Sequence, residues 1–265
     1  MKVAQVLQER IRQEQVTTGA MATMHLWPGI IETLRLAGLD YLIIDLEHGA
    51  FSDDLVADVC SVGRMTDFPV LIRPIDAGYS TVRRAIDFGS CGLLAPAIET
   101  VEQLDSIRDA IWMPPRGKRR PGGLSNRWIT DFNYSNWQTE VEANFIVLPQ
   151  IETRQGLENV DAIAGHEVTT AIAIGPYDLS AELGVCWEPD NKLLTDAIAA
   201  VRQAGRKAGK NMWLIGAGPQ LIAEGYAFVC IAEPMLAMQQ TLSRMNEDTK
   251  QGRQSDQSTP SGPLP

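Results

Sequence analysis

The sequence predicts a single-domain (β/α)₈ TIM barrel, and three observations lead to this fold. The chain has 265 residues, and one α/β barrel commonly fills about 250 residues. Eight short runs of apolar, often β-branched residues alternate with segments of helical periodicity. Most of these runs are apolar at every position rather than at alternate positions, which is typical of strands buried on both faces in a parallel sheet.

The predicted strands follow one another along most of the chain. They comprise residues 19–24, 41–46, 70–73, 92–95, 145–150, 170–174, 212–215 and 226–231. Helical signals fill the gaps: Thr100 and Gln103 form a capping box, and Gly38, Gly89 and Gly225 stand where helices end before a strand. A doubly wound open sheet is the alternative fold, but no G-x-G-x-x-G motif follows the first strand.

Composition divides the chain into a barrel and a tail. We expect the barrel over residues 1–245 and a disordered polar tail over residues 246–265, because residues 252–265 are rich in proline, serine and glutamine. Residues 113–144, between the fourth and fifth predicted strands, form a long loop rich in proline, glycine, arginine and tryptophan. Loops of this length are uncommon and are often functional.

Charge and hydropathy argue against several classes of protein. The chain has 23 Lys and Arg residues against 33 Asp and Glu residues, a net charge of −10, whereas a nucleic-acid partner requires a basic face. No stretch approaches the roughly 20 apolar residues of a membrane span, and the amino-terminal segment lacks the apolar core of a signal peptide. We therefore expect a cytoplasmic protein without membrane contact.

The four cysteines form no CxxC pair and lie mostly in apolar runs, so we expect reduced core residues.

Two carboxylates end neighbouring predicted strands. Glu152 and Asp178 follow the fifth and sixth strands, at the barrel end where active sites lie. Neighbouring strands are about 4.8 Å apart, so the two carboxylates can converge on one point, and a hard divalent cation would offset their repulsion. In the alternative interpretation, Glu152 pairs with Arg154 and Asp178 caps the following helix.

His48 and Arg73 end the second and third predicted strands. Asp45 and Glu47 can orient the His48 imidazole for proton transfer, although a lone histidine is more often structural. An arginine at a barrel mouth must pair with a carboxylate or bind an anion, so Arg73 is either a substrate ligand or part of a surface ion pair. No lysine ends a predicted strand, which argues against Schiff-base chemistry.

Six short motifs together resemble the HpcH/HpaI aldolase family, the metal-dependent class II pyruvate aldolases of the phosphoenolpyruvate/pyruvate barrel superfamily. The motifs are GLDYLIIDLEHG at 38–49, VLIRP at 70–74, AIDFG at 85–89, MPPRGKR at 113–119, QIE at 150–152 and IGPYDLS at 174–180. They stand in the family's order with near-constant spacing, and the resemblance extends over residues 19–242.

The resemblance implies a reaction and a site. The family reversibly cleaves 4-hydroxy-2-oxo acids to pyruvate and an aldehyde, through a pyruvate enolate that a divalent metal stabilises. Glu152 and Asp178 would hold the metal, which is Mg²⁺ or Mn²⁺ and alternatively Co²⁺ or Zn²⁺. The other matched positions would serve substrate and proton transfer: Arg73 as substrate ligand, His48 and Asp87 as an acid/base dyad, and Gln150, Gly175, Pro176 and Tyr177 as lining of the pyruvyl pocket. The resemblance also implies a homo-oligomer, a trimer or a hexamer of two trimers, in which the last helix packs on a neighbour.

Asp87 does not fit this picture within one subunit. It stands near the end of the third predicted helix, at the wrong end of its own barrel to meet His48. If Asp87 meets His48, either its helix is short or it comes from a neighbouring subunit; in the alternative interpretation, it pairs with Arg83 or Arg84.

Positions on the acceptor side depart from the family's pattern. Arg119 and Arg120 follow the MPP triplet, where they would either favour an acidic aldehyde or form an interface ion pair. After the eighth strand, Ala232, Glu233 and Pro234 replace the usual Gly-x-Asp.

Two other functions compete with the aldolase. An acyl-CoA ester carbon–carbon lyase, of the citryl-CoA or malyl-CoA type, shares the barrel and the acidic metal pair but needs a nucleotide-binding cleft. A non-catalytic barrel could serve as a binding module, and the retained His48, Arg73, Glu152 and Asp178 argue against it.

Overall fold

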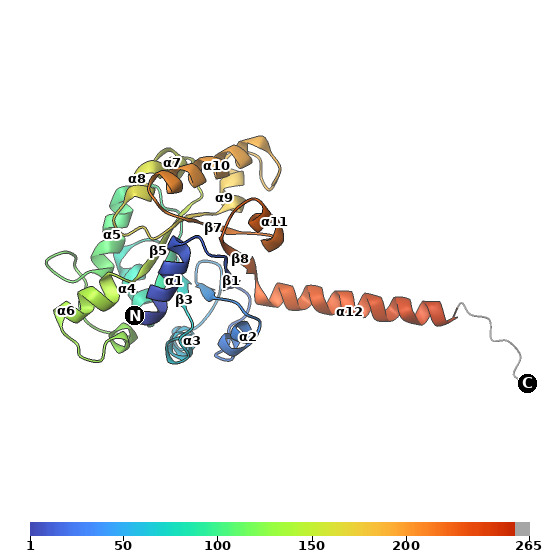
Figure 1. Ribbon diagram of the computed structural model, residues 1–265, viewed down its shortest axis with the longest axis horizontal. Helices are drawn as coiled ribbons and strands as arrows, with labels where there is room; N and C mark the ends of the chain where they lie inside the picture. The colour runs from blue at the N-terminus through green and yellow to red at the C-terminus, as the bar shows by residue number, and fades with distance from the viewer. Residues whose placement is uncertain (258–265) are drawn as a thin grey trace, which may run out of the picture.

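Eight parallel strands form a closed barrel in the computed structural model, which describes residues 1–257 (Figure 1). The strands pair in chain order, and β8 closes the barrel against β1. Their bounds are β1 Thr17–Ala22, β2 Tyr41–Asp45, β3 Val70–Arg73, β4 Gly92–Ala95, β5 Ile146–Ile151, β6 Ile172–Ile174, β7 Met212–Ile215 and β8 Phe228–Ala232. The predicted barrel is confirmed, and each strand begins and ends within two residues of its predicted bounds.

Helices α2 to α11 connect successive strands, whereas α1 precedes β1 and α12 follows β8. Their bounds are α1 Lys2–Arg12, α2 Ile30–Leu36, α3 Asp53–Met65, α4 Tyr79–Asp87, α5 Val101–Ile111, α6 Tyr134–Trp137, α7 Arg154–Glu158, α8 Val160–Gly165, α9 Pro176–Glu182, α10 Lys192–Lys207, α11 Gly218–Ala223 and α12 Pro234–Gln257. The predicted helix ends are confirmed. Gln103 Oε1 accepts from the Thr100 N–H at 3.0 Å, and Gly38, Gly89 and Gly225 have φ of 81°, 90° and 80°, a conformation that favours glycine.

Aromatic side chains fill the barrel interior. Trp213 Nε1 donates to Tyr41 Oη at 2.9 Å, and Tyr41 Oη donates to the Val229 carbonyl at 2.8 Å. The Phe228 ring packs edge-on against Tyr41, with centroids 5.2 Å apart. Because these polar atoms are paired, the rings are buried without a hydrogen-bond penalty. Tyr41 also lies against Gly19, where a Cβ atom would come 2.3 Å from Tyr41 Cζ, so this ring requires a glycine there.

Helix α1 covers the amino-terminal end of the barrel. Gln8 Nε2 donates to the Asn144 carbonyl at 2.9 Å, just before β5. Asn211 Nδ2 donates to the Ile11 carbonyl at 3.1 Å, just before β7. Leu7 is buried on the same face of the helix. Since α1 occupies this end, the carboxyl ends of the strands are left for a functional site, as in other barrels of this kind.

The long segment 113–144 is partly helical rather than a continuous loop. It contains a 3-10 helix, η1 (Leu124–Trp128), then α6 and a π-helical turn, η2 (Gln138–Glu142). Trp137 is fully buried, and its Nε1 donates to the Ile111 carbonyl at 3.2 Å. The segment is therefore packed onto the barrel.

The carboxyl-terminal region differs from the prediction. Helix α12 projects away from the barrel and continues to Gln257, so residues 246–257 are helical rather than disordered (Figure 1). Residues 258–265, the rest of the predicted tail, lie outside the described residues.

The cysteines and the hydropathy of the helices were the subject of two further expectations. Cys60, Cys91 and Cys230 are buried and unpaired as expected, whereas Cys186 is exposed, which corrects the prediction of a core position. Within residues 1–257, every helix is too short or too polar to cross a bilayer.

The contact between Gly19 and Tyr41 predicts the effect of a single methyl group. In Gly19→Ala the added Cβ would overlap the Tyr41 ring, and we expect the free energy of unfolding to fall by about 1–3 kcal/mol. Urea denaturation measures this change. Gly165→Ala is the matched control, because a Cβ at Gly165 meets no atom within 4 Å. Equal stability of the two variants would contradict the assignment.

Candidate active site

A cavity of about 260 Å³ opens at the carboxyl end of the strands. It is lined by Met21, His48, Arg73, Gln150, Gly175, Pro176, Tyr177, Asp178, Trp213 and Ile215. The structure therefore brings together every predicted substrate-binding residue, the predicted base His48 and the predicted metal ligand Asp178. Glu152, the other predicted metal ligand, bonds to the lining residue Gln150.

Asp45 holds the guanidinium of Arg73 from the neighbouring strand. The two residues are directly paired in the register of β2 and β3. Arg73 Nε and one terminal nitrogen donate to the two oxygens of Asp45 at 2.8 and 2.7 Å. Asp45 is 0% exposed and Arg73 is 7% exposed. This is a buried, two-pronged ion pair, the geometry in which arginine binds carboxylates best.

The ion pair keeps both groups charged. Burial alone would raise the pKa of Asp45 and lower the pKa of Arg73, because each charge loses water. The hydrogen bonds and opposite charges outweigh burial, so the pKa of Asp45 is lowered and that of Arg73 is raised. Another nitrogen of Arg73 lies 3.2 Å from Glu47 Oε2. Arg73 thus supplies a fixed positive charge to the cavity wall.

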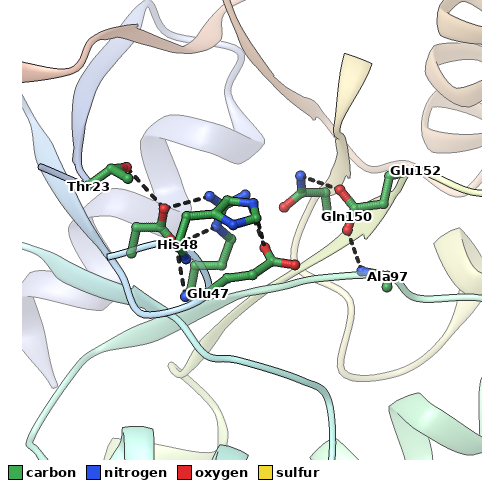
Figure 2. A network of polar contacts seen from close by, with 8 residues as sticks. Thr23, Glu47, His48, Ala97, Gln150 and Glu152 are labelled. Carbon is green, nitrogen blue, oxygen red and sulfur yellow. Dashed lines mark hydrogen bonds and ion pairs between the residues drawn. The ribbon is translucent and has the colours of Figure 1, made fainter. Parts of the chain in front are cut away.

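Asp45 also fixes the turn that carries His48. Its Oδ1 accepts from the N–H groups of Glu47 and His48 at 3.0 and 3.3 Å, and its Oδ2 accepts from the Thr23 hydroxyl at 3.0 Å. Figure 2 shows His48 beside Glu47, with Nε2 of the imidazole 3.9 Å from Glu47 Oε2. The His48 side chain is 60% exposed. The backbone is therefore held while the ring faces the cavity opening.

Glu152 is buried and forms no ion pair with any residue of the described range 1–257. It is 5% exposed, and its oxygens accept from the Ala97 N–H at 2.6 Å and from Gln150 Nε2 at 2.8 Å (Figure 2). Burial raises the pKa of Glu152 to about 7. The Ala97 N–H and the charge of Arg73 oppose this shift, whereas the charges of Glu47 and Asp178 add to it. Arg154, the alternative partner, instead donates to the Glu182 carbonyl at 2.7 Å.

The side chains around Glu152 fit a hard divalent cation. Gln150 Oε1 is buried and has no hydrogen-bond partner, so an acceptor oxygen stands beside the unneutralised carboxylate. A Cβ atom at Gly175 would come 2.2 Å from Glu152 Oε2, which means that the glycine keeps the space at this oxygen open. Within residues 1–257, no three His, Cys, Asp or Glu side chains converge on a metal position. A cation here would have Glu152 and Asp178 as ligands and complete its shell with substrate or water oxygens.

Asp87 lies apart from His48 in the same chain. Its Oδ1 accepts from Arg119 at 2.7 Å, while Arg84 pairs with Asp53. Asp87 therefore pairs with neither Arg83 nor Arg84, the partners considered from the sequence.

Arg119 is an interior residue, which corrects both expectations for it. Its side chain is fully buried, donates to Ser125 Oγ at 2.7 Å and lies over the Trp137 ring at 5.0 Å. It therefore reaches neither an acceptor pocket nor the surface of this chain. Arg120 is exposed.

Sequence reasoning missed Ala97. This residue has φ of 48°, the left-handed conformation that is strained for any residue with a Cβ atom. The conformation turns its N–H toward Glu152. No sequence signal marks it, because a glycine is the residue expected in such a turn. Thr23 was likewise not predicted, whereas Asp45 and Glu47 were named from the sequence only as groups that orient His48.

Both the sequence and the fold of the chain are similar to those of known proteins. The sequence profile of the HpcH/HpaI aldolase/citrate lyase family matches residues 26–217. The 2-keto-3-deoxy-L-rhamnonate aldolase of Shigella boydii is 29% identical over 92% of this chain and 93% of that protein. An HpcH/HpaI aldolase from Desulfitobacterium hafniense has a similar structure, with a TM-score of 0.82 and 23% identity over 97% of this chain and 99% of that one. The citrate lyase beta subunit of M. tuberculosis, complexed with oxaloacetate and magnesium, has a TM-score of 0.55 and 16% identity over 85% and 95% of the two chains.

The raised pKa of Glu152 predicts how metal binding depends on pH. Below about pH 7 this carboxyl holds a proton that a cation must displace, so affinity should rise about tenfold per pH unit up to pH 7 and then level off. Calorimetric titration with Mn²⁺ from pH 5.5 to 8.5 measures this dependence. Glu152→Gln should weaken binding and abolish the slope, whereas Glu158→Gln, at an exposed position on α7, should change neither. A flat profile in the unmodified chain would refute the assignment.

Proposed function

The chain belongs to the HpcH/HpaI aldolase/citrate lyase family, and on this premise we propose the reaction and the role of each site residue. The reaction is the reversible cleavage of a 4-hydroxy-2-oxo acid to pyruvate and an aldehyde. The observation that carries the proposal is the single cavity that joins Arg73, Gln150 and Asp178, with Glu152 bonded to its wall. This set offers one fixed positive charge and two carboxylates, and the charge of Asp178 acts on Glu152.

The size of the cavity favours a small 2-oxo acid. Its volume of about 260 Å³ lies below the range of about 300–1,000 Å³ that is usual for drug-sized ligands. Pyruvate fits this space, whereas a coenzyme A ester requires a longer cleft. The aldolase is therefore favoured over the acyl-CoA lyase alternative.

Cleavage of the bond between carbons 3 and 4 leaves negative charge on the pyruvate part, as an enolate. Glu152 and Asp178 would hold a divalent cation, which would supply positive charge to offset it. Arg73 binds the substrate and adds a second positive charge, held in place by Asp45. Gln150 orients Glu152 through its amide N–H and offers Oε1 to a donor on the substrate. The backbone of Gly175, Pro176 and Tyr177 closes the pyruvate side of the cavity.

His48 is the proposed base. During cleavage the imidazole takes the proton of the hydroxyl at carbon 4, the electrons of that O–H bond form the aldehyde carbonyl, and the bond to carbon 3 breaks toward the enolate. Carbon 3 then gains a proton to give pyruvate. The exposed ring and the fixed backbone of His48 suit this role. Since Asp87 pairs with Arg119 within the chain, the dyad expected from the resemblance would have to form across a subunit contact.

The exposed face of α12 supports a homo-oligomer, a trimer or a hexamer. Met238, Leu242 and Met245 recur at helical spacing and are 49%, 57% and 59% exposed. A helix that projects from its barrel with an apolar face gains stability when that face is buried. We therefore propose that α12 packs on a neighbouring subunit. The buried unpaired cysteines agree with a reducing compartment such as the cytoplasm.

Proton exchange of pyruvate tests the chemistry without knowledge of the aldehyde. With EDTA-treated protein in D₂O, addition of Mg²⁺ should cause loss of the methyl proton signal of pyruvate. Glu152→Ala should reduce the exchange rate at least 100-fold because the cation loses a ligand, and Glu158→Gln should leave it unchanged. Exchange that persists in Glu152→Ala would show that the metal assignment is wrong, and no exchange with Mg²⁺, Mn²⁺ or Co²⁺ would argue against the aldolase.

The role of α12 predicts an effect on molecular mass. Leu242→Asp places a charge on the apolar face and should shift the assembly toward smaller species in light scattering at micromolar concentration. Gln240→Asp, on the opposite face of the helix, should leave the mass unchanged. The same mass for both variants would locate the subunit contact elsewhere.

A further inference from the structure

A second cavity adjoins the candidate active site. Its volume is about 480 Å³, and it runs between α10 and α11 over β7. Pro176 and Ile215 line both this cavity and the active-site cavity. The two cavities therefore meet at these two residues, at the carboxyl end of β7. We call the second cavity the α10–α11 groove.

The groove has an apolar lining without positive charge. Its apolar side chains include Trp187, Pro189, Leu194, Ile198, Leu214 and Leu221. The charged residues in its lining are Asp190 and Glu224, and both are acidic. The groove therefore offers no counter-charge to a phosphate or a carboxylate, while its surface favours a hydrocarbon chain.

An aromatic pair connects the two cavities. Tyr177 lines the active-site cavity and Trp187 lines the groove. Their rings stack with centroids 3.3 Å apart and an angle of 14° between the planes. Ser180 Oγ accepts from the Trp187 N–H at 2.9 Å, and Trp187 has φ of 46°. This conformation is unfavourable for a tryptophan, so contacts of the loop, among them the hydrogen bond to Ser180, must stabilise it. The same contacts keep the ring against Tyr177.

We propose that the α10–α11 groove binds the apolar tail of the aldehyde acceptor while the active-site cavity binds pyruvate. This inference rests on the proposed aldolase activity and names its substrate class. The acceptor carbonyl lies in the active-site cavity, and the tail passes Pro176 and the Tyr177–Trp187 pair into the groove. The substrates are then 4-hydroxy-2-oxo acids that carry an uncharged chain of several carbons beyond carbon 4.

The tail takes no part in the bond changes. In condensation, carbon 3 of pyruvate loses a proton and bonds to the aldehyde carbon, whose oxygen gains a proton; cleavage reverses both steps. Burial of the tail therefore acts through binding and raises kcat/KM for long acceptors. Each fully buried methylene group contributes about fourfold, and hexanal has four more methylene groups than acetaldehyde.

Initial rates of pyruvate condensation by the full chain with Mg²⁺ test the inference. The acceptors are acetaldehyde, butanal, hexanal and succinic semialdehyde, an anionic acceptor with the same number of carbons as butanal. We expect kcat/KM for hexanal to exceed that for acetaldehyde at least tenfold. We expect succinic semialdehyde to react at least tenfold less well than butanal, because the groove is lined by acidic rather than basic groups.

Two tryptophan variants on α10 locate the effect. Ala199 lines the groove and is exposed, so Ala199→Trp fills it without disturbing the core. Ala200, the next residue, is also exposed but does not line the groove. The ratio of kcat/KM for hexanal to that for acetaldehyde should fall at least fivefold in Ala199→Trp and should stay unchanged in Ala200→Trp.

The exchange of pyruvate protons, measured for each protein, separates the possible failures. Absence of exchange in the unmodified chain overturns the proposed function and this inference with it. Exchange without a preference for longer acceptors overturns the inference alone, as does an equal response of the two tryptophan variants. A change in the mass of Ala199→Trp, with its acceptor preference retained, would assign the groove to a subunit contact instead.

Discussion

The buried carboxylate of Asp45 organises the open end of the barrel. It joins three successive strands, because Thr23 follows β1, Asp45 ends β2 and Arg73 ends β3. A carboxylate with no exposed surface must have its charge and its oxygens satisfied, and these partners satisfy them from opposite sides. The same contacts determine where Arg73 points and how the turn before His48 is folded. The positions of the Arg73 guanidinium and of His48, the proposed base, thus depend on one side chain.

Glu152 is buried in the same region, but it does not form an ion pair as Asp45 does. Its partners are two N–H groups, and the acidic side chains of Glu47 and Asp178 lie within electrostatic range. Asp45 is thus neutralised by Arg73, whereas Glu152 has no ion pair of its own within residues 1–257 and is the group that we propose binds a cation. The apolar groove adjoins this charged region at Pro176. This arrangement is the basis for the proposed substrate, which is an oxo acid at one end and a hydrocarbon at the other.

The strands and the residues at their carboxyl ends could be predicted from the sequence, because both depend on local patterns along the chain. Strands were found because their residues are apolar in unbroken runs, and His48, Arg73 and Asp178 were found because parallel strands bring their carboxyl ends to one rim. Contacts between distant segments were not found. The ion pair of Asp87 with Arg119 and the bond from Ala97 to Glu152 each depend on how a loop crosses the barrel. The extension of α12 to Gln257 was missed because its polar composition is equally typical of disorder.

The raised pKa of Glu152 affects the state of the protein before it binds a metal. Burial raises the pKa of Glu152 to about 7, so near neutral pH a proton on this carboxyl would reduce the repulsion among the acidic groups at the rim, and the barrel would then be able to close before a metal binds. Small zinc domains behave differently, since they remain unfolded until the metal arrives. For this chain, scarcity of a metal would leave a reservoir of folded, idle molecules rather than material for degradation. Supply of the ion, and not fresh synthesis, would then determine how quickly activity returns.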